Sequence, residues 1–152
     1  MKNFILISTI ALLAASCIRV NENPNPNANL SSYAETEGIF IHVKQGADNP
    51  HEVLMALSMA TKFESDYDVL MYFDIDGIEM VTDDAPNLEM EPFGSSDELF
   101  KKLVNSGVTI FACPGCMKVA GIEPSELRSG VTVAEKHEFF DFTDGRILSI
   151  DY

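Results

Sequence analysis

Two closely spaced cysteines are the part of this sequence with the clearest chemical potential. Cys113 and Cys116 enclose Pro114 and Gly115, and they directly follow the apolar run at residues 108–112. A cysteine reacts as its thiolate, and two neighbouring thiols can act as a nucleophile and a resolving group. The same spacing also occurs in half of a metal site, in a structural disulfide and in small buried core residues. Other features of the sequence are needed to choose among these four possibilities.

Several features favour a reactive thiol over the other three possibilities. A structural zinc site needs four ligands, whereas this chain has one cysteine pair and three scattered histidines, so we expect no metal and no cofactor. A disulfide that closes so short a loop adds little chain-entropy stability. Inert core thiols and a thioredoxin-like redox pair stay open as alternatives. In thioredoxin-like proteins, however, the pair usually comes early and after a Trp, and this chain has no Trp.

The residues around the pair predict a short helix at 114–120. Pro114 suits the first turn because its missing N–H would be unpaired there, and Gly121 suits the end of the helix. Cys113 then lies at the N-terminal end, where free N–H groups and the helix dipole favour a thiolate. Cys116 lies one turn further on, close enough to act as a resolving thiol. The sequence therefore predicts Cys113 as the nucleophile and Cys116 as its neighbour at the catalytic site.

Alternating strands and helices must position this pair. Runs rich in β-branched and aromatic residues predict strands, and capping signals at Asn49-Pro50 and Ser95 predict two amphipathic helices. This alternation is typical of a single α/β domain with a mostly parallel sheet of about five strands. The strands are expected at 38–44, 68–73, 108–112, 131–134 and 147–150. A further helix is expected at 134–142, an extended piece at 78–81 and a loop at 82–94.

The ends of two predicted strands give a candidate pocket. In open parallel sheets, ligands bind beyond the carboxyl ends of the strands. The turn with Gly46, Asp48 and Asn49 leaves the first strand there, and Pro114 and Gly115 leave a later one. We expect these five residues to line the pocket.

Two further polar residues receive structural roles from the sequence. His42 alternates within the first strand and is expected to be a buried, hydrogen-bonded histidine. Asp74 follows the second strand and is expected to be a solvated loop charge.

The N-terminus has the pattern of an exported lipoprotein. Lys2 precedes an apolar stretch at residues 4–15, which is shorter than the roughly 20 residues of a spanning helix. Small residues then lead directly to Cys17, as at a lipoprotein cleavage site. We therefore predict a signal peptide at 1–16, a lipidated Cys17, a disordered Asn/Pro-rich tether at 17–36 and the domain at 37–152. Plain secretion is the alternative.

The negative charge of the chain argues against polyanionic partners. Its formal net charge is -14, from 24 acidic and 10 basic residues. Nucleic acids and anionic membranes bind clustered Lys and Arg, so neither is expected to contact the domain surface. The predicted membrane contact is the lipid anchor alone.

The stretch VTIFACPGCMKVAGI at residues 108–122, followed by Leu127 and Gly130-Val131, resembles the DsrE/DsrF-like family. This family includes sulfur-relay proteins of the DsrE and TusD type and YchN-like proteins. The first strand and its Gly46-Ala-Asp-Asn-Pro turn support the resemblance, which extends from Gly38 to the C-terminus. It implies a three-layer α/β/α domain (DsrEFH-like) that forms trimers or hexamers.

The resemblance also implies a role for Cys113. In the sulfur-relay members, the cysteine after the strand carries a persulfide and passes sulfur between donor and acceptor proteins. Cys116 has no counterpart in single-cysteine members, and the relay proteins are cytoplasmic, whereas this chain has an export signal. We therefore predict a sulfur carrier or sulfurtransferase-like protein in a bacterial cell envelope, facing the periplasm or exterior. A non-catalytic ligand- or partner-binding lipoprotein domain and thiol–disulfide exchange at Cys113 and Cys116 are the alternatives.

Overall fold

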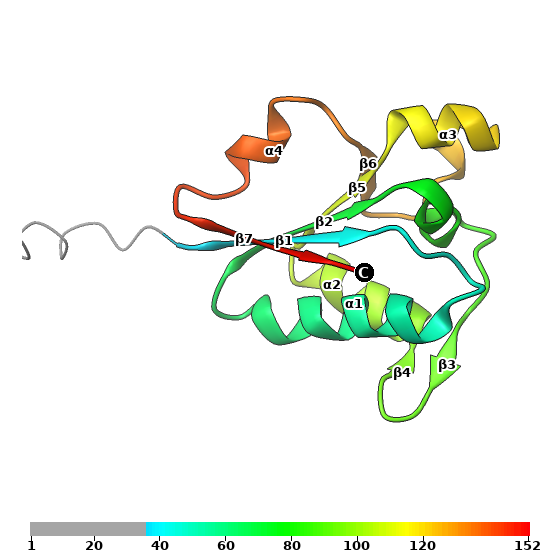
Figure 1. Ribbon diagram of the computed structural model, residues 1–152, viewed down its shortest axis with the longest axis horizontal. Coiled ribbons are helices and arrows are strands. Elements are labelled where there is room, and N and C mark those ends of the chain that lie inside the picture. Colours follow the sequence, from blue (N-terminus) through cyan, green and yellow to red (C-terminus); the bar gives the residue numbers. More distant parts are fainter. Residues whose placement is uncertain (1–35) are drawn as a thin grey trace, which may run out of the picture. The chain divides into compact units, whose positions relative to one another are not determined.

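A five-stranded sheet forms the centre of the computed structural model, which describes residues 36–152 (Figure 1). The strands lie in the order β6-β5-β2-β1-β7, and every neighbouring pair is parallel. Their bounds are β1 Gly38–Val43, β2 Asp68–Phe73, β5 Thr109–Ala112, β6 Val131–Val133 and β7 Ile147–Asp151. The predicted parallel sheet is confirmed. The predicted signal peptide, Cys17 and nearly all of the predicted tether lie outside the described residues.

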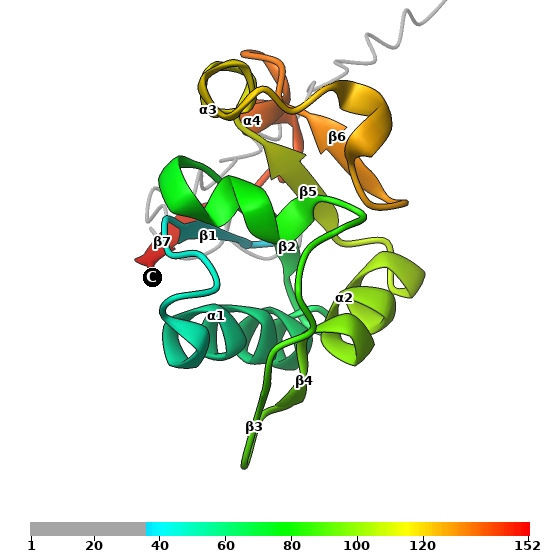
Figure 2. The ribbon, with the colours of Figure 1, turned by 90° about the vertical axis from the view of Figure 1, so that its right-hand side faces the viewer.

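Helices cover both faces of the sheet and produce the predicted three layers. The helices α1 (Pro50–Phe63) and α2 (Ser96–Asn105) lie on one face, and α3 (Pro114–Ala120) and α4 (Glu138–Asp141) lie on the other (Figures 1 and 2). The shorter elements are the 3-10 helices η1 (Ile75–Val81) and η2 (Pro124–Glu126) and the hairpin of β3 (Glu89–Met90) and β4 (Gly94–Ser95).

The alternation of side chains along the strands divides them between two cores. Ile39, Ile41 and Val43 of β1 are buried in the larger core, which also contains Leu57 of α1 and Leu103 of α2. Successive side chains of a strand point to opposite faces, so Phe40 and His42 lie on the side of α3 and α4. The polar groups at the end of β1 therefore share a face with the cysteine-bearing helix.

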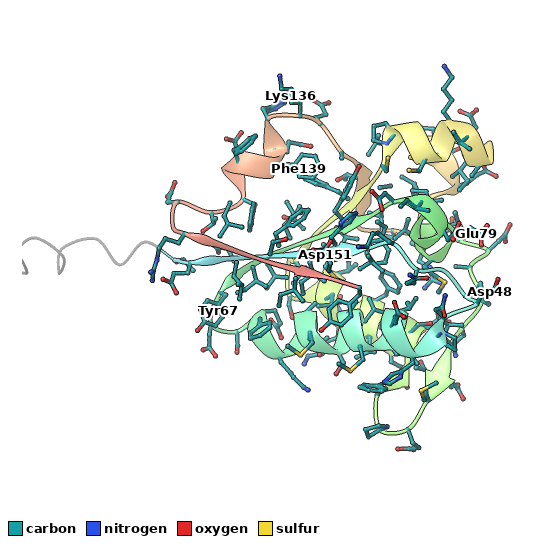
Figure 3. The ribbon with its side chains drawn as sticks, in the orientation of Figure 1. Asp48, Tyr67, Glu79, Lys136, Phe139 and Asp151 are labelled. Carbon is teal, nitrogen blue, oxygen red and sulfur yellow. The ribbon has the colours of Figure 1, made fainter. Side chains whose placement is uncertain are left out.

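A small aromatic cluster occupies this second face. The ring of Phe139 from α4 lies 5.1 Å from that of Tyr72, 5.5 Å from that of Phe111 and 6.2 Å from that of Phe40, between centroids. The neighbouring Phe140 points away and is 74% exposed. Figure 3 shows Phe139 between α4 and the sheet. One phenylalanine of α4 thus holds this short helix against the strands.

Three sequence predictions about secondary structure are wrong. The loop predicted at 82–94 contains β3 and the first residue of β4, which pair as a short antiparallel hairpin. Residues 78–81 belong to the 3-10 helix η1 and are not extended, because this segment turns across the end of β1, where the Gly77 N–H donates to the Lys44 carbonyl at 3.0 Å. The helix expected from Ala134 begins only at Glu138. The Ala134 N–H donates to the Ala112 carbonyl at 3.0 Å, so this residue still follows the ladder of β5 and β6.

Within residues 36–152, no helix combines the length and the apolar character needed to cross a membrane.

Candidate functional site

The two cysteines lie where β5 gives way to α3, as the sequence predicted. Cys113 is the N-cap of α3, and its sulfur accepts a hydrogen bond from the Cys116 N–H at 3.2 Å. The Cys113 N–H donates to the Phe73 carbonyl at 3.0 Å, which ties the cysteine to the end of β2. Pro114 opens the helix, and Gly121 ends it with a φ of 72° in the left-handed region that glycine tolerates. Both cysteines are free thiols and half-buried.

Hydrogen bonds favour the thiolate form of Cys113. Burial acts to raise the pKa of this thiol, but hydrogen bonds from the side chains of Cys116 and Tyr72 and from the N–H groups of Cys116 and Gly115 outweigh it. The pKa of Cys113 therefore lies below its ordinary value of 9.0. A lowered pKa increases the thiolate fraction, and the thiolate is the nucleophile in sulfur chemistry.

Cys116 has the opposite tendency. Burial, the hydrogen bond with Cys113 and the negative charges of Cys113 and Asp74 raise the pKa of Cys116, while a hydrogen bond from the Ile75 N–H lowers it. That N–H lies 3.2 Å from the Cys116 sulfur. The pair is therefore divided into a nucleophilic Cys113 and a Cys116 that keeps its proton.

Tyr72 of β2 is a site residue that the sequence analysis missed. Burial, then its hydrogen bond with Cys113 and the negative charges of the two thiols and Asp74, raise the pKa of this phenol. Tyr72 therefore stays protonated and donates to the Cys113 sulfur. It is the penultimate residue of β2 and lies beside β5. Its place near the end of a predicted strand was one signal, but the pairing of β2 with β5 could not be predicted from the sequence.

His42 of β1 connects the site to two carboxylates. Its Nδ1 lies 2.9 Å from Oδ1 of Asp151 and its Nε2 lies 2.9 Å from Oδ1 of Asp74. The second pair of atoms lacks the alignment of a hydrogen bond, so both atoms are buried without a hydrogen-bond partner. The His42 ring stacks on Tyr72 with centroids 5.6 Å apart. The hydrogen bond from His42, together with Lys44, lowers the pKa of Asp151.

Asp74 differs from its sequence prediction. Its side chain is only 18% exposed, so it is not a solvated loop charge. It follows β2 directly, lies beside His42, and its negative charge contributes to the raised pKa values of Tyr72 and Cys116. His42, at 22% exposure, is half-buried between carboxylates.

The predicted pocket residues occupy two groups. Pro114 and Gly115 are exposed beside the thiols, in the first turn of α3. Gly46, Asp48 and Asn49 lie in the turn after β1, and Figure 3 shows Asp48 at the end of the sheet at which the strands terminate. Asn49 is the N-cap of α1, but its side chain donates to Gln45 and makes no capping bond.

The 3-10 helix η1 contacts both the turn after β1 and Cys116 of α3. A Cβ on Gly46 would lie 2.7 Å from the Asp76 carbonyl oxygen, and the Ile75 N–H donates to Cys116. Ile75 has a φ of 48°, which is strained for a β-branched residue. Such strain is often found at functional sites. This element therefore belongs to the site, although the sequence analysis did not include it.

Among residues 36–152, no group of three or more His, Cys, Asp and Glu side chains has the arrangement of a metal site.

Comparison of the chain with known proteins shows which family it belongs to. The model of the DsrE/DsrF-like family matches residues 38–145. No curated protein matches the chain. Solved structures that share the fold include MTH1491 from Methanobacterium thermoautotrophicum, described as a protein of unknown function, and the ychN protein from E. coli.

The two structures are similar in architecture more than in sequence. MTH1491 is 13% identical with a TM-score of 0.55, covering 76% of this chain and 100% of its own. The ychN protein is 16% identical with a TM-score of 0.53, covering 76% of this chain and 99% of its own. At this identity the likeness shows the fold alone. Because the family model spans most of the sheet and both cysteines, the chain belongs to the DsrE/DsrF-like family.

Proposed function

We propose that this protein carries sulfur as a persulfide on Cys113, in the manner of a sulfur carrier or sulfurtransferase. The observation that supports this most is the set of hydrogen bonds that Cys116 and Tyr72 direct at the Cys113 sulfur. They favour a thiolate on a half-buried side chain that small molecules or a partner thiol can reach. Membership of a family that includes sulfur-relay proteins is consistent with this role.

The proposed reaction has a loading step and a transfer step. In loading, the Cys113 thiolate attacks the outer sulfur of a donor RS–SH; its S–S bond breaks, RS⁻ leaves, and Cys113–S–SH forms. In transfer, an acceptor thiolate attacks the outer sulfur, and Cys113 leaves as its thiolate. Tyr72 assists the transfer step because its O–H stabilises that thiolate. Each step exchanges one S–S bond for another.

Mass spectrometry under anaerobic conditions tests the proposal. The reduced protein is incubated with glutathione persulfide and its intact mass is measured. We expect a gain of one sulfur atom in the Cys116→Ser variant and no gain in Cys113→Ser, both made with Cys17→Ser, because Cys113 is the thiol of this pair whose pKa is lowered. Equal uptake by the two variants, or none by either, would contradict the assignment to Cys113.

A second candidate is thiol–disulfide exchange. The hydrogen bond of 3.2 Å between the Cys116 N–H and the Cys113 sulfur holds the two residues in a single turn, as a reversible disulfide requires. Equilibration with glutathione redox buffers separates the candidates, since exchange proceeds without any persulfide donor. If native Cys113 and Cys116 resist both alkylation and persulfide, the remaining function is non-catalytic binding of a ligand or partner.

We also propose that the protein is anchored in a bacterial cell envelope through lipid on Cys17. The lipoprotein pattern at residues 13–17 and the Asn- and Pro-rich stretch after it support this placement. The sulfur donor and acceptor are then thiols or proteins outside the cytoplasm. Membrane fractionation tests the anchor: we expect the protein in the detergent phase and Cys17→Ser in the aqueous phase or retained as an uncleaved precursor.

A homo-oligomer, a trimer or hexamer, is proposed as the working form. Large apolar side chains at the β7 edge and on α4 support this, since Ile147, Leu148 and Phe140 are exposed in the single chain. Analytical ultracentrifugation of the purified protein tests it, and a sedimentation mass of one chain at micromolar concentration would overturn it.

A further inference from the structure

The position of Cys116 raises a question that a single-thiol carrier would not. Its N–H donates to the Cys113 sulfur at 3.2 Å, and the two side chains are themselves hydrogen-bonded. Any persulfide on Cys113 would therefore form beside a second thiol. Cys113 is the N-cap of α3 and Cys116 is three residues on. A disulfide needs Cα atoms within roughly 4.4–6.8 Å, and residues on one such turn can meet this requirement.

We infer that Cys116 discharges the Cys113 persulfide internally, so that the site releases hydrogen sulfide and becomes a Cys113–Cys116 disulfide. This inference rests on the proposed function and extends it from sulfur transport to sulfur reduction. The substrate class is a sulfane-sulfur donor, and the product is inorganic sulfide.

The reaction balances without any further reactant. The persulfide anion Cys113–S–S⁻ takes the proton of the Cys116 thiol, and the Cys116 thiolate attacks the inner sulfur, which is Sγ of Cys113. The bond between that sulfur and the outer sulfur breaks, and the outer sulfur leaves as HS⁻. The outer sulfur gains two electrons, which the two cysteines lose as they form the disulfide.

The surroundings of Cys116 fit both parts of this step. Burial of Cys116, its hydrogen bond with Cys113 and the nearby charge of Asp74 favour the protonated thiol, so Cys116 holds a proton that the leaving sulfur can take. The Ile75 N–H lies 3.2 Å from the Cys116 sulfur and is placed to stabilise the thiolate that then forms. Ile75 has a φ of 48°, so the backbone adopts an unfavourable conformation where it provides this donor.

The inference also predicts what must act next. The disulfide cannot accept more sulfur until it is reduced, so each turnover requires a dithiol reductant such as a thiol–disulfide oxidoreductase. The site is thus supplied by a reaction that produces sulfane sulfur. It is returned to its reduced state by a reaction that reduces disulfides.

Sulfide release after loading tests the inference. The full chain carries the substitution Cys17→Ser, so that Cys113 and Cys116 are its only cysteines, and it is purified in detergent. It is reduced, loaded anaerobically with glutathione persulfide and freed of small molecules by rapid gel filtration. Sulfide is then measured over time, and intact mass is recorded without reductant.

We expect this chain to release about one sulfide per loaded Cys113. Its final mass should be two hydrogens below that of the reduced, unloaded protein, because the disulfide has formed. With Cys116→Ser or Cys116→Ala added, the protein should keep its extra sulfur, with sulfide release at least about tenfold slower because the intramolecular nucleophile is gone. Circular dichroism checks that each variant is folded, and Cys113→Ser is the control for loading.

The outcomes separate this inference from the proposed function. If the chain with both cysteines keeps the extra sulfur as long as Cys116→Ser does, the inference is overturned while the carrier function stands. A disulfide that forms without an equal amount of sulfide also overturns it. If no variant gains sulfur, the proposed function fails and the inference fails with it.

Discussion

The Cys113 sulfur accepts hydrogen bonds from two elements of the fold. Cys116 and Gly115 belong to α3, whereas Tyr72 comes from β2. The donors within α3 follow from local sequence, because any residue at an N-cap faces the N–H groups of the next turn. The Tyr72 donor depends on the pairing of β2 with β5, which puts Tyr72 opposite Phe111. The reactivity of Cys113 is thus partly local and partly tertiary.

Removal of the Tyr72 hydroxyl should make Cys113 less acidic. In Tyr72→Phe the pKa of Cys113 rises, because one hydrogen bond to the thiolate is lost while burial is unchanged. A hydrogen bond to a charged group contributes about 1.5–3 kcal/mol, which changes the thiolate fraction by a factor of about 10 to 100, so we expect alkylation near neutral pH to slow by roughly that factor. The pH dependence of iodoacetamide alkylation measures this.

Tyr67→Phe provides a matched control for this substitution. Tyr67 packs edge-on against Phe63 and lies at the opposite end of the sheet from the cysteines (Figure 3). Its substitution should leave the alkylation profile unchanged. An unchanged profile in Tyr72→Phe would show that Tyr72 does not act on Cys113.

Relief of the strain at Ile75 should stabilise the protein. Its φ of 48° costs an isoleucine about 1–3 kcal/mol, whereas glycine adopts this region freely but loses more entropy on folding. Since the Ile75 side chain is 57% exposed, Ile75→Gly removes little buried surface. We expect a net gain of about 1 kcal/mol in the free energy of unfolding, measured with urea. The exposed neighbour Asp76, which has no such strain, is the control: Asp76→Gly should destabilise.

At the scale of elements, η1 connects three parts of the site. Its backbone contacts the end of β1 through Gly77 and the turn after β1 through Asp76, and its first N–H reaches Cys116. Its apolar residues Ile78, Met80 and Val81 are buried. The sequence predicted an extended piece at 78–81, and this was wrong because the conformation depends on how closely the segment approaches β1.

Gly77→Ala tests this close approach. A Cβ at position 77 would lie 2.4 Å from the Val43 carbonyl oxygen, so η1 must shift away from β1 and weaken the Gly77 N–H bond to Lys44. Overpacking of this kind costs about 1–3 kcal/mol of unfolding free energy. Because the shift also moves the Ile75 N–H from Cys116, Cys116 alkylation should slow. Asp76→Ala is the control, and equal stability of the two variants would contradict the contact.

At the scale of the whole molecule, the thiol pair makes stability depend on pH. The native pKa of Cys113 is lowered, so as pH rises towards 9.0 the unfolded chain binds more protons than the native one, and stability increases. The native pKa of Cys116 is raised, so above 9.0 the native chain holds the extra proton, and stability falls.

Denaturant titrations at pH values below and above 9.0 should show a maximum in the free energy of unfolding that the thiol pair contributes. Relative to the double variant Cys113→Ser, Cys116→Ser, the reduced protein should gain free energy of unfolding up to a pH near 9.0 and lose it beyond. The serines do not titrate there, so groups that do not interact with the thiols cancel in the comparison. The pKa of Tyr72 is raised partly by the thiols, so this phenol adds to the loss of stability at the alkaline end. Parallel curves for the two proteins would mean that the thiols do not interact in the native state.

The sequence by itself determined the order of the five sheet strands and of the helices α1, α2 and α3, the parallel sheet, and the cysteine pair at the start of α3. These depend on local signals: β-branched runs, Pro114 and Gly121 at the ends of α3, and alternation of strands with helices. It also carried the family resemblance, which the family model now shows.

Only the tertiary structure decided which distant side chains surround the cysteines. Tyr72 and Asp74 reach the site because β2 pairs with β5, and His42 joins them because β1 pairs with β2. Asp151 is brought to His42 by the pairing of β7 with β1, across 109 positions of sequence. No local pattern encodes these contacts, since strand order is set by packing of the whole sheet and not by the residues near each strand end.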